Sequence, residues 1–308
     1  LRSRLSRVVV RTLRRQVKEQ VKFTARRSIV EDFSPTLEEQ ELYERVGDFL
    51  RREESFAFPP GRRALMLLVY RKILASSSFA LASTLERLAG SLREQLGGGA
   101  GAEPASDPDL APFAEEAEEW EEGPASASAR PGPALARRMR AELRELDACA
   151  RLARAIRSNA KGQALVRGLD RAFTVARACG WPEKAVVFTE FRRTQDHLRE
   201  LLAGRGYSVT CLSGDSGGAD RRQALVEEFR DRSQILLMTE AGAEGLNLQF
   251  CNLVVNYDLP WNPQRIEQRI GRCHRYGQSR DVLVVNLLNR RNAADARLYE
   301  LLGEKLRL

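Results

Sequence analysis

The sequence has 308 residues, a length that suggests two domains or one large one, and its 43% hydrophobic residues can bury a substantial core, which excludes wholesale disorder. Its 50 Lys and Arg exceed its 42 Asp and Glu, for a net charge of +8. Residues 94–129 hold ten acidic residues and no basic one, so the other 272 residues carry +18. This excess favours a polyanionic partner, nucleic acid first. The alternative is a GC-rich coding bias, since 44 of the 50 basic residues are Arg.

The five cysteines include no Cys-x-x-Cys pair, which argues against a zinc site or a disulfide framework and fits a reducing cytosol. The longest apolar run, residues 64–70, is too short to cross a bilayer, and we expect no membrane partner. The sequence begins at Leu1 rather than Met, and we expect a fragment of a longer protein.

The first half of the chain is predicted to be mostly helical. A basic segment, 1–36, contains a short strand at 8–10, a helix to about 22 and an extended stretch at 29–33. Ser34-Pro35-Thr36 then supplies a helix start. Helices are expected over 37–52, 62–76, 79–96, 134–158 and 161–178. The stretch 97–133, rich in Gly, Ala, Pro, Ser and Glu, is interpreted as a flexible acidic linker.

From residue 184 the pattern changes to short apolar runs that alternate with helices. Strands are predicted at 185–189, 207–212, 234–239, 253–257 and 282–287, and helices after 191, at 221–230, at 263–275 and from about 293. This alternation predicts an α/β fold, a parallel sheet with helices on both faces, preceded by the helical region. The functional loops of such a sheet follow the carboxyl ends of its strands.

The predicted helix 263–275 carries the clearest candidate site. On a helical wheel Gln268, Arg272 and Arg275 fall within about 60° of one another, opposite the apolar side of the helix. Four arginines in eleven residues, with Glu267 as the one acidic residue among them, repel one another unless an anion approaches, and the planar guanidinium suits phosphate oxygens. A solvated helix surface is the alternative.

Three strand ends add weaker signals. The turn from Thr239 to Asn247 contains Gly242 and Gly245, which let backbone N–H groups approach a ligand. The other two ends are Thr189-Glu190 and Ser213-Gly214. Each signal alone is typical of an ordinary turn.

Taken together, in this order and spacing, these segments resemble the second RecA-like lobe of superfamily 2 nucleic-acid-dependent ATPases. Residues 188–191 resemble motif IV, 239–247 motif V and 268–275 motif VI. Trp261-Asn262-Pro263 ahead of His274-Arg275-Tyr276-Gly277-Gln278 resembles the SWI/SNF-type translocase pattern. Arg269 and Gly271 resemble the bacterial branch that includes the RNA-polymerase-recycling ATPase RapA. The resemblance is specific over 184–291 and looser over 1–60.

The resemblance implies a role for each matching residue. Arg272 and Arg275 would be arginine fingers that reach the γ-phosphate of ATP on the other lobe. Gln268, Gly245 and Asn247 would lie at the nucleotide, although Asn247 stands where relatives often have Asp. The nucleic-acid contacts would be Thr189, Glu190, Ser213, Gly214, Thr239 and Gly242.

The parts that hold ATP and Mg²⁺ are missing from the sequence. It contains no G-x-x-x-x-G-K-[ST] and no Asp-Glu pair that ends an apolar strand. We therefore expect this chain to be inactive alone and to need, as partners, an N-terminal RecA-like lobe that binds most of the ATP and Mg²⁺, and double-stranded DNA. The expected location is the bacterial cytoplasm, at the nucleoid.

Two other functions remain open from the sequence, a non-catalytic docking module for nucleic acid or protein and an RNA-directed helicase lobe. The expected organisation is a basic inter-lobe connection at 1–36, a helical region at 37–96, the acidic linker at 97–133, further helices at 134–180 and the RecA-like lobe at 181–308.

Overall fold

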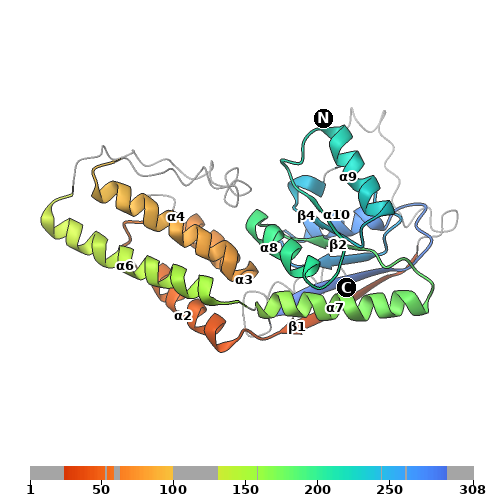
Figure 1. Ribbon diagram of the computed structural model, residues 1–308, viewed down its shortest axis with the longest axis horizontal. Coiled ribbons are helices and arrows are strands. Elements are labelled where there is room, and N and C mark those ends of the chain that lie inside the picture. The colour runs from red at the N-terminus through yellow and green to blue at the C-terminus, as the bar shows by residue number, and fades with distance from the viewer. Residues whose placement is uncertain are drawn as a thin grey trace, which may run out of the picture.

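The computed structural model of the protein describes residues 24–52, 54–58, 63–99, 131–157, 159–243, 245–260 and 262–289. Figure 1 shows two parts side by side, a group of helices and an α/β unit. The helices are α2 (Leu37–Arg51), α3 (Arg63–Ser76), α4 (Ser78–Leu96), α6 (Pro133–Ala155), α7 (Ala160–Ala178), α8 (Arg192–Ala203), α9 (Ala219–Asp231) and α10 (Pro263–Cys273). The strands are β1 (Arg26–Phe33), β2 (Ala185–Phe188), β3 (Val209–Leu212), β4 (Ile235–Met238), β5 (Leu253–Asn256) and β6 (Val282–Asn289).

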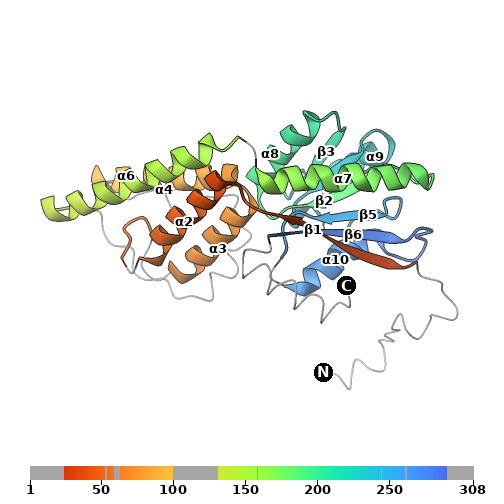
Figure 2. The same ribbon diagram turned by 90° about the horizontal axis from the view of Figure 1, so that it is seen from below.

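All strand pairs in the sheet are parallel, and the strand order is β1-β6-β5-β2-β4-β3. The edge strand β1 comes from the part of the sequence expected to connect two lobes. It lies beside β6 (Figure 2), with which it pairs from Arg26 opposite Val282 to Phe33 opposite Asn289. The sheet therefore includes a strand that lies about 150 residues before β2 in the sequence, outside the expected lobe range 181–308.

Helices cover both faces of the sheet, as predicted. On one face α9 and α10 pack on side chains of alternate strand positions such as Val186 and Phe188. On the other face α7 and α8 pack on the intervening positions, such as Val187. Because successive strand residues point to opposite faces, an uninterrupted apolar strand such as β2 supplies both cores.

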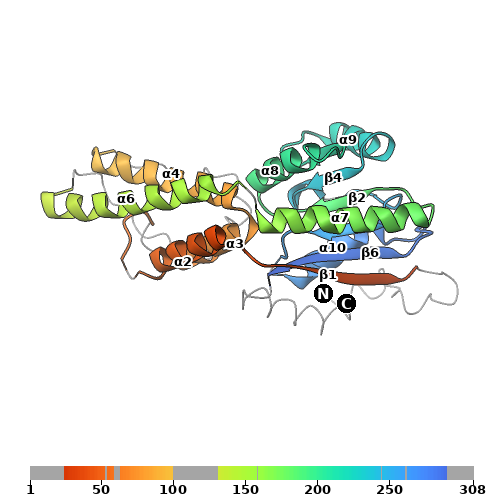
Figure 3. The same ribbon diagram turned by 60° about the horizontal axis from the view of Figure 1, so that its bottom comes forward.

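Helices α2, α3, α4 and α6 share a separate apolar core. The start of α2 is fixed by a capping box, in which Thr36 Oγ1 accepts a hydrogen bond from the Glu39 N–H and Glu39 Oε2 accepts one from the Thr36 N–H. Figure 3 shows α6 between α4 and α2, and no other described helix lies against its remaining face. Glu142 of α6 is buried. Its carboxylate accepts hydrogen bonds from the backbone N–H groups of Phe56 and Ala57, which compensate for its lost hydration.

The predicted helices and strands within the described residues are confirmed, with ends that differ by a few residues. The extended stretch predicted at 29–33 is the second half of β1. The expectations for 1–23, for the acidic segment 100–130 and for a final helix from about 293 lie outside the described residues.

A buried polar cluster joins the helical part to the carboxyl edge of the sheet. Asp258, which follows β5, accepts hydrogen bonds from Lys161 Nζ at 2.8 Å and from Ser76 Oγ at 2.8 Å. It also accepts bonds from Thr189 Oγ1 at 2.7 Å and from the Glu190 N–H at 3.1 Å. Burial alone would raise the pKa of Asp258, but the Lys161 charge and these donors outweigh burial and hold the pKa below its usual value. The carboxylate of Asp258 thus connects α3, α7, β2 and β5.

Candidate nucleotide-facing site on helix α10

Helix α10 is amphipathic and begins with a side-chain cap. Asn262 Oδ1 accepts a hydrogen bond from the Gln264 N–H, and Pro263 occupies the first turn, where its missing N–H costs nothing. Ile266, Ile270 and Cys273 are buried against the sheet. The helix ends at Cys273 rather than at 275, so Arg275 lies in the turn that follows and is exposed. The wheel that placed Arg275 on the helix was wrong at this position.

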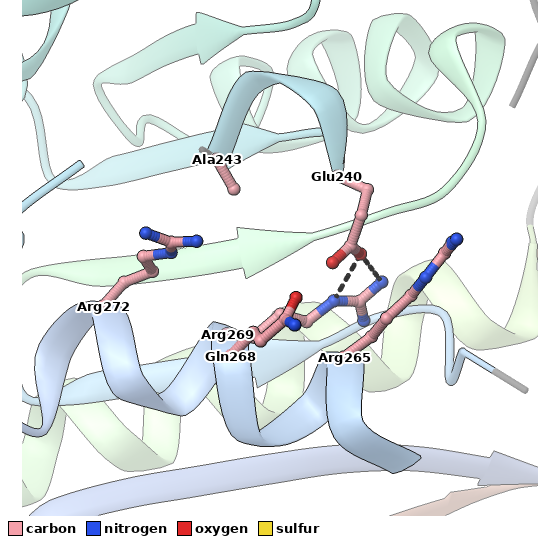
Figure 4. Close-up of a pocket in the computed structure, with 6 residues that line it drawn as sticks. All are labelled: Glu240, Ala243, Arg265, Gln268, Arg269 and Arg272. Atoms are coloured by element: carbon pink, nitrogen blue, oxygen red, sulfur yellow. Dashed lines mark hydrogen bonds and ion pairs between the residues drawn. The ribbon is translucent and has the colours of Figure 1, made fainter. Parts of the chain in front are cut away.

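The outward side of α10 lines a cavity of about 220 Å³. Figure 4 shows Arg265, Gln268 and Arg272 projecting from α10 toward the turn after β4, which contributes Glu240 and Ala243. Gln268 is exposed and Arg272 is half-buried. Neither Arg265 nor Arg272 forms an ion pair with any residue in the parts of the chain that the structure describes. The structure thus brings Gln268 and Arg272 together, and a cationic surface with hydrogen-bond donors remains open to an anion.

Arg269, the sixth residue of this wall, has a different role. Its side chain is 1% exposed and stacks over the Phe188 ring, with the guanidinium carbon 5.1 Å from the ring centroid. Nε and Nη2 donate to Glu240 Oε2 at 2.9 and 2.7 Å, and Nη1 donates to the Asp258 carbonyl at 2.7 Å. The expectation that Arg269 repels its neighbours on an open surface was wrong, because Glu240 neutralises it. Arg269 fixes α10 to the ends of β4 and β5.

The turn after β4 is closely packed within the fold. The N–H of Gly242 donates to the Thr239 carbonyl, and a Cβ at Gly242 would lie 2.6 Å from Leu212 Cδ2 and 2.8 Å from the Leu212 carbonyl oxygen. Glycine is therefore required at 242 by the neighbouring strand β3. Thr239 is 8% exposed. The Gly242 N–H is thus used within the turn, and the expected contact of the Gly242 backbone with nucleic acid stays a prediction.

Ser213 and Gly214 lie beside this turn, where β3 ends. A Cβ at Gly214 would be 3.1 Å from Ala241 Cβ, so the two turns touch. Ser213 donates its N–H to Ser216 Oγ, and the Gly214 carbonyl accepts a bond from Arg222. Both residues are half-buried, so part of each faces solvent.

The expected nucleotide contacts Gly245 and Asn247 lie further along the loop. Gly245 is exposed with φ +75°, a conformation that favours glycine, and Asn247 is exposed with Oδ1 accepting a bond from the Gln249 N–H. Gln278, the last residue of the predicted translocase pattern, donates its amide to the carbonyls of Gln249 and Cys273. It ties this loop to the end of α10.

Thr189 and Glu190 are enclosed by the junction with the helical part. Thr189 is 0% and Glu190 8% exposed, Thr189 bonds to Asp258, and Glu190 forms an ion pair with Lys72 of α3. Burial raises the pKa of Glu190 in spite of the nearby Lys72 and Arg269 charges. The expectation that these two side chains contact nucleic acid is corrected, because the chain's own helices cover them.

Sequence reasoning assigned no structural role to three residues that organise the site: Arg269, Glu240 and Asp258. One signal was present. At 100° per residue Arg269 falls beside Ile266 and Cys273 on the wheel of α10, on its buried side. No comparable pattern pointed to Asp258, whose partners come from three segments far apart in the sequence.

The donor set of the cavity suits a phosphate group rather than a metal ion. Arg265, Arg272 and Gln268 offer N–H donors, whereas the carboxylate in the wall, Glu240, is engaged by Arg269. Within the described residues, no three His, Cys, Asp or Glu side chains are grouped to hold a metal ion. None of the described helices is long and apolar enough to span a membrane.

Comparisons with known proteins agree with this architecture. Residues 173–277 match the model of the helicase conserved C-terminal domain. The uncharacterized ATP-dependent helicase YqhH of Bacillus subtilis is 44% identical over 41% of this chain and 22% of its own length. The ISWI chromatin-remodeling complex ATPase CHR17 of Arabidopsis thaliana is 35% identical over 41% of this chain and 12% of its own length.

A solved structure, the C-terminal part of the Fun30 ATPase domain, has a similar fold along most of the chain. Its TM-score is 0.50 at 19% identity, with 91% of this chain and 90% of that chain covered. The chain thus carries a helicase C-terminal domain on a RecA-like sheet. More narrowly, over about two fifths of its length the chain is similar to superfamily 2 helicases, and SNF2-like ATPases are among the similar proteins. The chain spans about a fifth or less of the two curated relatives.

Proposed function

We propose that this chain is the C-terminal half of an ATP-dependent DNA translocase, in which Arg272 and Arg275 complete an ATP site carried by an N-terminal RecA-like lobe outside this sequence. The observation that carries the proposal is the open cationic wall of α10. Arg272 and Gln268 line a cavity without an ion pair to the described residues, while the adjacent Arg269 is buried and neutralised. An arginine that serves only the fold would be expected to be buried and ion-paired, as Arg269 is.

The role of Arg272 and Arg275 is electrostatic. Negative charge spreads over the γ-phosphoryl oxygens as the bond to the leaving phosphate breaks, and a guanidinium placed there stabilises the transition state by roughly 10³–10⁵ in rate. Arg272 comes from the last turn of α10, and exposed Arg275 comes from the turn after it. Gln268, about one turn before Arg272 on the same side, would report the nucleotide state to the lobe.

ATP and Mg²⁺ belong to the proposal in a limited way. The wall of α10 fits the terminal phosphates of ATP, and no described carboxylate in that wall is available for Mg²⁺. The metal and most of the nucleotide would therefore be bound by the N-terminal lobe, which agrees with the missing phosphate-loop motif.

Double-stranded DNA is the proposed nucleic acid. The support is the Trp261-Asn262-Pro263 and His274-Arg275 pattern together with the charge of +18 outside residues 94–129. The exposed parts of Ser213 and Gly214, which touch the turn after β4, are the proposed phosphate contacts on this lobe. A cytoplasmic location at the nucleoid follows if the substrate is a bacterial chromosome.

Steady-state ATP hydrolysis tests the proposal. The purified chain with duplex DNA should show background turnover, and turnover should appear when the N-terminal lobe is supplied. In that assembly Arg272→Ala or Arg275→Ala should reduce kcat at least about a thousandfold and leave DNA affinity nearly unchanged. Arg232→Ala, an exposed arginine after α9, is the matched control.

Two results would refute the proposal. Robust turnover by the chain alone would contradict the half-enzyme function. Loss of DNA binding rather than turnover in Arg275→Ala would move that residue to the nucleic-acid surface. Comparison of duplex DNA, single strands and RNA as activators separates a DNA translocase from an RNA-directed lobe, since the latter requires stronger stimulation by RNA.

A further inference from the structure

Helix α6 carries a row of four arginines on its outward face. Arg137, Arg140, Arg144 and Arg151 are all exposed. At 100° per residue they fall within about 60° of one another, opposite the buried residues Met139 and Leu146. We call these four residues the α6 arginine row. Because α6 packs between α4 and α2, the row lies on the side that no described helix covers (Figure 3).

The row differs from the other arginines of the helical part. Four arginines that face a neighbouring helix or loop each have an acidic partner there: Arg52 with Glu145, Arg93 with Asp147, Arg138 with Glu54 and Arg154 with Glu86. No member of the row has an ion-pair partner among the described residues. Like charges three and four residues apart on a helix repel each other, so the row costs stability unless it meets an anion.

The dimensions of the row fit a polyanion rather than a single anion. Fourteen residues at about 1.5 Å per residue place Arg151 roughly 21 Å from Arg137. Phosphates along one strand of duplex DNA recur about every 3.4 Å of helix axis, so the row runs past about six of them. A lone phosphate or carboxylate could engage one or two members only. Guanidinium groups bind phosphate oxygens in bidentate geometry without reading base sequence.

We propose that the α6 arginine row is a sequence-independent binding surface for the phosphate backbone of duplex DNA, outside the RecA-like lobe. The identity of the polyanion rests on the proposed function, but the surface does not involve α10 or the strand-end loops. The helical part would thus add to the DNA-bound area and to its salt dependence, and α6 would be a second point of attachment beside the lobe.

The test is fluorescence anisotropy of the 308-residue chain with a labelled random-sequence duplex, measured over a series of salt concentrations. The variant replaces the whole row: Arg137→Gln, Arg140→Gln, Arg144→Gln and Arg151→Gln. Glutamine keeps helix propensity and length. We expect the slope of log K against log salt to fall by up to about 3.6, at about 0.9 for each lost phosphate contact, and the affinity at 0.1 M salt to fall at least about tenfold.

A second variant has the same change in net charge at exposed arginines elsewhere that also have no ion pair to described residues. It carries Arg157→Gln, Arg167→Gln, Arg199→Gln and Arg232→Gln. Its slope should fall by less than about 1. Equal effects of the two variants would overturn the proposal, because net charge alone would then explain them. Circular dichroism of both variants checks that α6 is retained.

The acidic stretch at 94–129, which leads directly into α6, is the competing occupant of the row. If the row substitutions change DNA affinity and its salt dependence only after the acidic residues at 103–122 are changed to Gln or Asn, the row binds this acidic segment in the unmodified chain. The proposal is then wrong. Failure of the proposed function is separate: it appears as hydrolysis insensitive to Arg272→Ala in the assembled enzyme. Absence of DNA binding by the unmodified chain at low salt would overturn the row's role directly.

Discussion

Lys161 is the residue whose replacement tests most directly how the helical part is held to the lobe. Its Nζ donates to Asp258 Oδ1 at 2.8 Å and to the Ala75 carbonyl at 3.0 Å, and lies 4.6 Å from the Tyr257 ring centroid. The two charged side chains are 8% and 4% exposed. Lys161→Met keeps the apolar stem but leaves the Asp258 carboxylate buried with neutral donors only. Removal of one partner of a buried pair costs about 3–5 kcal/mol, and the remaining donors favour the lower end of this range.

The partner substitution, Asp258→Asn, should cost a similar amount, because it leaves the Lys161 ammonium buried and turns an amide N–H₂ toward one of the former donors. If the two residues act as one pair, the double variant loses much less than the sum of the single losses. We expect a coupling energy of about 2–3 kcal/mol, at the upper end for residues in contact.

Urea denaturation followed by circular dichroism measures these changes, with Arg167→Met as the control. Arg167 lies on the same helix α7, is exposed and loses the same charge, so its unfolding free energy should change by no more than about 0.5 kcal/mol. Losses below about 1 kcal/mol for Lys161→Met, or additive losses in the double variant, would refute the view that this pair fastens the junction.

The pH dependence of the pair has a defined sign. The pKa of Asp258 is lowered in the fold, so its contribution is fully present above the unfolded value of about 3.9 and is lost as pH falls through the lower folded value. The stability difference between the unmodified chain and Asp258→Asn should therefore be constant near neutral pH and close below about pH 4. A difference that closes between pH 5 and 7 would assign the effect to another group.

Three further substitutions test the packing around the site. Gly242→Ala should destabilise the chain by about 1–3 kcal/mol in urea denaturation, because its Cβ would meet the Leu212 backbone, whereas Gly271→Ala, with open space at Cβ, should not. Arg269→Gln should cost about 3 kcal/mol by breaking its ion pair with Glu240, and Arg265→Gln, on the same helix, less than about 0.5 kcal/mol. The pKa of Glu190 is raised in the fold, chiefly by burial. The contribution of Glu190 to the free energy of unfolding is therefore full below the unfolded pKa of about 4.3, and it is lost as pH rises through the higher pKa of the folded state. Glu190→Gln should remove that decline from the pH profile of the urea midpoint.

The elements of the lobe could be predicted because its short strands are uninterrupted apolar runs. β2, β4 and β5 are buried at every position, which sequence periodicity records directly. The pairing of β1 with β6 could not be predicted in the same way. It joins residues more than 250 positions apart, and β1 is an edge strand of mixed burial with a charged sequence. Its assignment as a connection followed from the looser resemblance over residues 1–60 and from its basic composition, neither of which reports such distant partners.

The sequence predicted which residues of the candidate site share one side of α10, but not which site residues are buried. The helix period placed Gln268 and Arg272 on one side correctly, because α10 is regular up to Cys273. The helix period failed for Arg275, since the helix ends first. The strand-end rule, which pointed to Thr189 and Glu190, did not show that helices from another part of the chain cover them. A strand end that is open in an isolated sheet can thus be closed by a neighbouring helical part, and only tertiary contacts decide this.

The arginines of α10 separate into two environments, and the separation has a physical cause. Arg269 lies on the buried side of the helix, where an unpaired charge would be very costly. The fold supplies it with the Glu240 carboxylate, the Asn256 side-chain oxygen and the Asp258 backbone carbonyl. Arg265 and Arg272 sit at the boundary with solvent, where water compensates the charge and no partner is required. The same chemistry therefore fixes the helix through one arginine and leaves others available to an incoming phosphate. Because Arg269 fixes the helix backbone, the proposed role of Arg272 would start from a preorganised position, and such preorganisation is the condition under which a charge stabilises a transition state efficiently.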